Sequence, residues 1–139
     1  MDRLCQLKQN KGGASVVRFS ADKPIYVQIV DALSARIVTR YYEPGTKFPT
    51  VRDLAIELGV NPNTVQRALS DLEQRGFLYS ERTSGRFVTE DKARLDEART
   101  SLISGEAIVF VKNMKRFECA GDELLGVVRS AVKECNNDF

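Results

Sequence analysis

Apolar residues recur at helical spacing early in this chain. Ile25, Ile29, Leu33 and Ile37 repeat every four residues. That period predicts an amphipathic helix with one buried face. The helix is expected to begin near Pro24, because a proline's fixed φ and missing N–H suit a first helical position.

Two shorter helical patterns follow, and each carries its own start signal. Thr50 and Asp53 have the spacing of a capping box, and Gly59 is placed to end that helix in the left-handed region. Asn61, followed by a proline, is an N-cap signal for a second helix over 62–75. Only a tight turn separates the two helices, so they are expected to cross steeply. The residues predicted to face inward are Leu54, Ala55, Leu58, Val65, Ala68, Leu69 and Leu72.

Short alternating segments predict strands. FLYS at 77–80 and RFVT at 86–89 form a predicted β-ribbon, and VVRF at 16–19 is predicted as a further short strand. The ribbon is joined by 81–85, where Gly85 can adopt a positive φ near the tip.

The order of helix, tight turn, helix and ribbon predicts a winged helix-turn-helix domain over residues 16–89. The predicted fold class is mainly α with a small β-wing. Residues 1–15 are polar and contain a Gly-Gly pair, so they are expected to form a flexible tail.

Polar side chains occupy the exposed N-terminal side of the predicted helix 62–75. In a helix-turn-helix this is the part that meets base edges in the major groove. Asn63 and Gln66 can pair with adenine, and Arg67 can bind guanine or a phosphate. Arginines at 82 and 86 flank the ribbon tip, where guanidinium groups suit phosphates or a narrow minor groove.

Residues 90–139 return to helical periodicity. One apolar stripe runs from 95 to 117 and a second from 124 to 135, separated by Gly121 and Asp122. Two helices cannot bury two such stripes by themselves, so another surface must cover them. A second copy of the chain would do so with two-fold symmetry; packing against the winged helix is the alternative. The expected dimer-interface residues are Leu102, Val109, Phe110, Met114, Phe117, Leu124, Val128 and Val132.

The composition argues against enzyme and metal chemistry. The 139 residues include no histidine, which removes the commonest general base and a common zinc ligand. Cys5, Cys119 and Cys135 have spacings of neither a disulfide framework nor a zinc site. We therefore expect no catalytic residues, no metal and no cofactor.

Charge and hydropathy point to a nucleic-acid partner rather than a membrane. No apolar run approaches the ~20 residues that span a bilayer, and no signal peptide is recognisable, so a soluble, cytoplasmic protein is expected. Residues 1–88 carry 13 basic and 9 acidic side chains, and residues 89–139 carry 8 and 10. The basic excess therefore lies in the part with the helix-turn-helix pattern, which suits phosphate contact.

Five segments in series resemble the N-terminal winged-helix domain of the GntR family of bacterial transcription regulators. They are PIYVQI at 24–29, PG at 44–45, FPTVRDLA at 48–55, LGVNPNTVQRALSDLEQRGFL at 58–78 and GRFV at 85–88. The short helical tail is similar to that of the YtrA-like branch of the family, in which two helices serve for dimerisation. So short a tail leaves no room for the large effector domains of other branches.

The resemblance implies roles for individual residues. Arg52 matches an arginine that contacts DNA from the first helix of the motif, and Arg67, with Thr64 beside it, matches one on the recognition helix. The wing around Gly85 matches one that enters the minor groove. The expected DNA-binding residues are Thr50, Arg52, Asn61, Asn63, Thr64, Gln66, Arg67, Arg82, Ser84, Gly85 and Arg86.

The chain departs from the family pattern at three places. Arg40 stands where the family has a glycine before its Pro-Gly turn, and Phe48-Pro49-Thr50 stands where the family has Leu-Pro-Ser. The change from serine to threonine keeps the capping oxygen and costs little. Thr83 stands where the family's wing has its first glycine.

The predicted function is a dimeric, sequence-specific repressor that binds an inverted repeat in double-stranded operator DNA. The recognition helix 62–75 would lie in the major groove and the wing 80–87 in or near the minor groove. A small-molecule effector is left open. The alternatives are an enzyme and a winged helix that binds protein or RNA, whose exposed helix start would be apolar or acidic rather than carry Asn63, Thr64 and Arg67.

Overall fold

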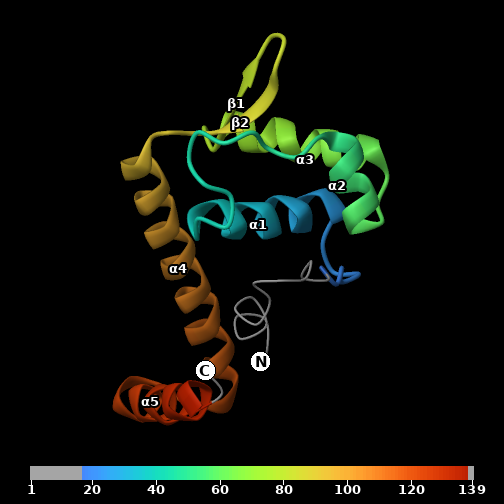
Figure 1. Ribbon diagram of the computed structural model, residues 1–139. Coiled ribbons are helices and arrows are strands. Elements are labelled where there is room, and N and C mark those ends of the chain that lie inside the picture. Colours follow the sequence, from blue (N-terminus) through green and yellow to red (C-terminus); the bar gives the residue numbers. More distant parts are fainter. Residues whose placement is uncertain (1–16, 138–139) are drawn as a thin grey trace. The chain divides into compact units, whose positions relative to one another are not determined.

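The computed structural model describes residues 17–137, which are mainly helical with one small antiparallel sheet (Figure 1). The chain divides into two compact units between Arg99 and Thr100. In chain order the elements are α1 (Ile25–Val38), α2 (Val51–Leu58), α3 (Pro62–Gln74), β1 (Leu78–Glu81), β2 (Gly85–Val88), α4 (Lys92–Met114), the 3-10 helix η1 (Lys115–Phe117) and α5 (Gly121–Asn137).

The first unit holds a single hydrophobic core between its three helices and the sheet. The predicted inward faces of α1, α2 and α3 are confirmed, with the exceptions of Ile25, which is 46% exposed, and Leu58, which is half-buried. Ile25 is the first residue of α1. The core cluster is formed by Ile29, Val30, Leu33, Ile37, Phe48, Leu54, Ala55, Val65, Ala68, Leu69, Leu72, Phe77, Leu78, Val88 and Leu95.

The helix-turn-helix is defined by its caps, as the sequence predicts. The Asp53 backbone N–H donates to Thr50 Oγ1 at 3.1 Å, and the Thr50 N–H donates back to the Asp53 carboxylate at 3.4 Å. Gly59 ends α2 with a φ of 65°. Asn61 Oδ1 then accepts the Asn63 N–H at 2.8 Å, which caps α3. Caps of this kind each stabilise a helix by about 1 kcal/mol.

The strand predicted at 16–19 is wrong for the described residues 17–19, which form no strand. The backbone that follows is bound by a side chain instead. Gln28 of α1 accepts the Ser20 N–H and donates to the Ser20 and Lys23 carbonyls, each at 2.8 Å. Phe19 packs against the core, so this segment is held by one amide side chain and one aromatic ring.

The strand β2 is paired along both edges. On one side it pairs with β1 in antiparallel register, Leu78 opposite Val88 and Glu81 opposite Gly85. On the other it binds residues 45–48: the Gly45 N–H donates to the Val88 carbonyl at 2.9 Å and the Phe48 N–H to the Arg86 carbonyl at 2.8 Å. The sequence predicts the ribbon to within one residue at each end, but not this third segment.

A buried arginine connects α1 to the first helix of the helix-turn-helix. Arg36 of α1 donates to Glu57 of α2 at 2.9 Å and to the Tyr42 hydroxyl at 3.3 Å. Burial alone would lower the pKa of Arg36, but these two partners outweigh it and the pKa is raised. The guanidinium therefore stays charged and links α1 to α2.

The first turns of α4 belong to the first unit, beyond the boundary at residue 89 that the sequence predicts. Leu95 is fully buried in the core, and Arg40 donates to Asp96 at 3.0 Å. The family's glycine position is thus occupied by an arginine with a φ of 64°. This arginine, unlike a glycine, has a side chain that reaches α4.

The second unit consists of the rest of α4, η1 and α5. Gly105 does not interrupt α4, and Glu118, with a φ of 55°, ends η1 before α5 begins at Gly121. Cys119 and Leu124 are the buried residues of its described part. None of the helices among residues 17–137 combines the length and apolar character that crossing a bilayer requires.

Candidate nucleic-acid interface

The start of α3 presents polar side chains to solvent. Because Val65, Ala68 and Leu69 turn into the core, the neighbouring Asn63 and Gln66 are left exposed. This matches the placement expected for base contact. Arg67 is also exposed, Thr64 is half-buried, and Asn61 is exposed with its side-chain oxygen engaged in the cap. Gln66 Nε2 lies 3.4 Å from Ser70 Oγ on the next turn.

Eight arginines of the first unit differ in whether a carboxylate neutralises them. Arg36, Arg40, Arg75, Arg86 and Arg94 each form an ion pair with a carboxylate. Arg52 on α2, Arg67 on α3 and Arg82 at the wing are exposed and pair with no acidic side chain among residues 17–137. An exposed cation without an internal partner is free to meet a phosphate at little cost.

Arg86 differs from the other three arginines expected at the interface. Its Nε donates to Glu73 Oε1 of α3 at 2.7 Å, and its side chain is only 21% exposed. Ser80 Oγ of β1 hydrogen-bonds the same Glu73 oxygen. Glu73 therefore attaches both strands of the wing to the recognition helix, and the charge of Arg86 is already partly neutralised by this carboxylate.

The wing tip is a tight turn over residues 82–84. Arg82 and Ser84 are exposed there, and Gly85 has a φ of 99°, as expected from the sequence. Thr83 has no positive φ. The missing family glycine at Thr83 therefore imposes no backbone strain on this wing.

Lys47 is a basic residue beside the wing that the sequence did not indicate. Its backbone forms a β-bridge to Phe87 of β2. Its side chain lies beside Gly85, since a Cβ added at Gly85 would be 3.5 Å from Lys47 Cε. Lys47 is exposed and has no acidic partner among the described residues. Only the pairing of segment 45–48 with β2 brings it there, and no local pattern in the sequence announces that pairing.

On α2, the two residues expected to contact DNA have different surroundings. Arg52 is exposed. The Thr50 oxygen accepts the Asp53 N–H, and its hydroxyl proton can still be donated to a phosphate. Arg52 is the stronger candidate for contact from this helix because it offers a positive charge and several donors.

A tyrosine from α1 lies beside the recognition helix. The Tyr26 side chain is half-buried and lies under Arg67, with the guanidinium carbon 3.7 Å from the ring centroid. The two residues line an open groove together with Ser70, Asp71 and Gln74. Asp71, the acidic residue in this lining, is paired with Arg75.

The second unit exposes many apolar side chains among its charged ones. Phe117 is 71% exposed, and Leu102, Val109, Phe110 and Val132 are also exposed. Met114 and Val128 are half-buried and Leu124 is buried. Further exposed apolar residues, which the sequence stripe did not include, are Ile103, Ile108, Val111, Leu125 and Val127.

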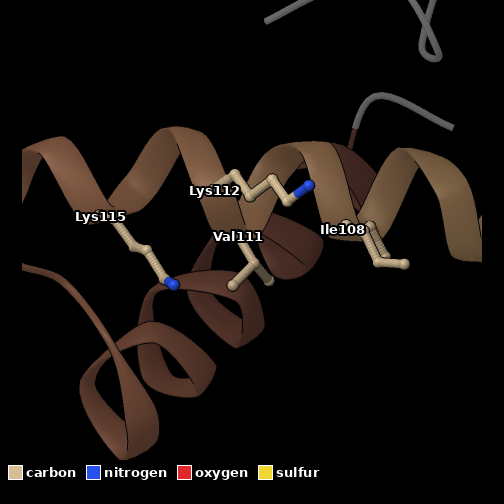
Figure 2. A pocket seen from close by; sticks show the side chains of 5 residues that line it. Ile108, Val111, Lys112 and Lys115 are labelled. Atoms are coloured by element: carbon tan, nitrogen blue, oxygen red, sulfur yellow. The ribbon is translucent and has the colours of Figure 1, made fainter.

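The run 108–111 shows why a single stripe is too narrow a description. Four consecutive apolar residues in a helix point to all sides, since successive side chains are about 100° apart. Figure 2 shows Ile108 and Val111 beside Lys112 and Lys115 at an open groove on α4, which Ala107 completes. This part of α4 therefore needs cover on more than one side.

The acidic and thiol side chains of the described residues are not arranged as a metal site. Within residues 17–137, no three His, Cys, Asp or Glu side chains are grouped so that they could hold a metal ion. The first unit offers unpaired cations and amides on its surface, and the second offers exposed apolar side chains between charged ones.

Similarity to known proteins covers both units. The family model described as bacterial regulatory proteins, gntR family, matches residues 25–88. The chain is 37% identical over 113 residues to the uncharacterized HTH-type transcriptional regulator YhcF of Bacillus subtilis (strain 168), covering 81% of this chain and 93% of that protein. It is 32% identical over 93 residues to the HTH-type transcriptional repressor YtrA of the same organism, covering 67% of each.

A solved structure is similar over the same extent. The GntR family transcriptional regulator from Listeria monocytogenes superimposes with a TM-score of 0.75 at 36% sequence identity. The match covers 81% of this chain and 98% of that one. The similarity therefore includes helices beyond the helix-turn-helix and wing.

Proposed function

The chain belongs to the GntR family of bacterial transcription regulators, and on that premise we propose that it is a homodimeric repressor that binds an inverted repeat in double-stranded operator DNA. One of the relatives described above is itself named a repressor. The predicted place of action is the cytoplasm, where such DNA lies. This function is regulatory binding, not catalysis.

The observation that carries the proposal is the set of unpaired cations on the first unit. Arg52, Arg67 and Arg82 come from α2, α3 and the wing, and none is neutralised by a carboxylate among the described residues. In a winged helix-turn-helix these three elements meet one duplex, with the recognition helix in the major groove. Lys47 adds a fourth unpaired cation beside the wing.

Base recognition falls to the exposed side chains at the start of α3. Asn63 and Gln66 offer amide groups that suit the donor and acceptor pattern of adenine. Arg67 offers the donors that bind either guanine or a phosphate. The wing, with Arg82 and Ser84 at its tip and Gly85 beside them, would lie in or near the minor groove.

Dimerisation is supported by the second unit. Its exposed apolar residues lie on both helices, and the run 108–111 requires cover on several sides. A second copy supplies a matching apolar surface under two-fold symmetry. Two recognition helices would then enter successive major grooves, about 34–36 Å apart.

The test is selection of bound duplexes from a random pool, followed by footprinting and a measurement of mass in solution. We expect an inverted repeat bound by a dimer, and reduced transcription in vitro from a promoter that carries this site. A single unrepeated half-site occupied by a monomer would contradict the dimer. Equal binding to RNA of the same sequence would contradict specificity for DNA.

A further inference from the structure

We propose that Tyr26 is a positioning residue for Arg67: its ring holds the guanidinium in place on the surface of α3, ready for contact with DNA. The inference rests on the proposed DNA-binding function and assigns a role to a residue of α1 outside the helix-turn-helix. Its basis is the stacked pair, with 3.7 Å between the Arg67 guanidinium carbon and the Tyr26 ring centroid.

The geometry of the pair leaves the donors of Arg67 available. A guanidinium that lies on an aromatic ring uses its face for the contact, whereas its five N–H donors point outward in its own plane. The Arg67 side chain makes no hydrogen bond or ion pair with the described residues. The ring therefore fixes the side chain without consuming the groups that bind a base or a phosphate.

The surroundings leave the ring as the contact that fixes Arg67. Asp71, one helical turn further along α3, is paired with Arg75, and Ser70 is hydrogen-bonded to Gln66. An unrestrained arginine would lose most of its rotamer freedom on binding, which costs up to about 2 kcal/mol. Stacking on Tyr26 removes part of that loss before DNA arrives.

The first experiment uses the free protein, so its outcome does not depend on DNA. The Nε–Hε signal of Arg67 is identified in an NMR spectrum by its loss in Arg67→Lys. We expect this signal to shift in Tyr26→Leu, which removes the ring, and to keep its position in Tyr26→Phe, which retains it. In the control Tyr41→Leu, which changes an exposed tyrosine beside Arg36, it should also stay. An unchanged signal in Tyr26→Leu would overturn the proposal.

The second experiment measures affinity for a duplex selected by the wild-type protein and for a scrambled duplex. Tyr26→Leu should weaken binding to the selected duplex about two- to fivefold, the equivalent of about 0.5–1 kcal/mol. Tyr26→Phe and Tyr41→Leu should stay within about twofold of wild type. In an Arg67→Ala background, Tyr26→Leu should cause no further loss, because the two residues act as one unit.

The remaining outcomes each decide the question. Tighter binding by Tyr26→Leu would mean that the ring withholds Arg67 from DNA. An equal loss in Tyr26→Phe, or an equal loss without Arg67, would mean that the hydroxyl or the ring acts independently. Each of these overturns the positioning role while leaving DNA binding intact. If the wild-type protein binds no duplex, the proposed function fails as well, and the loss is already visible before any variant is made.

Discussion

The two units of this chain are stabilised in different ways. The first buries a continuous apolar core under capped helices and leaves amides and cations outside. The described part of the second buries Cys119 and Leu124 and leaves a large share of its apolar side chains in solvent. A domain with its own core can present polar chemistry on its surface, whereas a unit whose apolar residues face outward depends on a partner surface.

The largest effect is expected from a charge placed in the second unit. Phe110→Asp puts a carboxylate among the exposed apolar residues of α4, and burying it in an interface would be costly. We expect the dimer to dissociate and affinity for the inverted repeat to fall about a hundredfold or more, because two linked binding events become one. Mass in solution and DNA titration measure the two effects.

The control for this change keeps the charge and moves it to a polar position of the same helix. Asn113→Asp adds the same carboxylate at an exposed polar residue of α4. It should leave the dimer intact. A Phe110→Asp protein that remains dimeric with unchanged affinity would show that the apolar side of α4 near Phe110 is covered from elsewhere.

A cavity in the first unit should lower stability and leave the dimer intact, the opposite of the effect expected for Phe110→Asp. Leu69→Ala removes a fully buried side chain from α3 and should lower the free energy of unfolding by about 2–5 kcal/mol. The dimer should persist wherever the protein is folded. Denaturation at one fixed protein concentration measures the change, since the stability of a dimer depends on concentration. The control is Gln74→Ala, at an exposed position of the same helix, which should change the free energy of unfolding by no more than about 0.5 kcal/mol. If Leu69→Ala costs no more than this control, the core is not the main source of stability.

Within the first unit, replacing an unpaired arginine should affect DNA binding, whereas replacing a paired one should affect stability. Arg67→Ala should weaken binding to the selected duplex by about 1–3 kcal/mol and leave the free energy of unfolding nearly unchanged. Arg86→Ala removes a half-buried partner of Glu73 and should lower the free energy of unfolding by up to about 1 kcal/mol. Titrations against matched and scrambled duplexes, beside denaturation curves, distinguish the two. If Arg86→Ala affects only DNA binding, Glu73 does not anchor the wing.

The features that were predicted from the sequence are those fixed by neighbours within a few residues. Thr50 with Asp53, and Asn61 with Asn63, complete their hydrogen bonds inside one helical turn. The pattern of residue types therefore contains the whole interaction, and the helix boundaries follow from it. The strand expected at 16–19 is wrong because a short alternating run carries no information about a pairing partner.

The features that the sequence did not reveal join residues far apart in the chain. Lys47 reaches Gly85 only through the pairing of segment 45–48 with β2. Glu73 of α3 binds Arg86 of β2, and Tyr26 of α1 contacts Arg67 of α3. Each of these residues looks like an ordinary surface or helix residue in its own segment. Their roles arise from packing, which a single sequence without its fold does not display.

The smallest effect is expected at Arg40, whose side chain joins the first unit to the start of α4. Arg40 has a φ of 64°, which costs a non-glycine residue about 1–2 kcal/mol, and its Nη1 is buried without a hydrogen-bond partner among the described residues. Its ion pair with Asp96 is largely solvated and contributes no more than about 1 kcal/mol. Arg40→Gly should therefore raise the free energy of unfolding by up to about 1 kcal/mol, although it removes an ion pair. Asp96→Asn, which breaks the pair and keeps the strained backbone, should lower it slightly in the same denaturation assay. If Arg40→Gly is instead the more destabilising of the two, the attachment of α4 through Asp96 outweighs the backbone cost, and the first turns of α4 are a stronger part of the first unit than the solvation of this pair suggests.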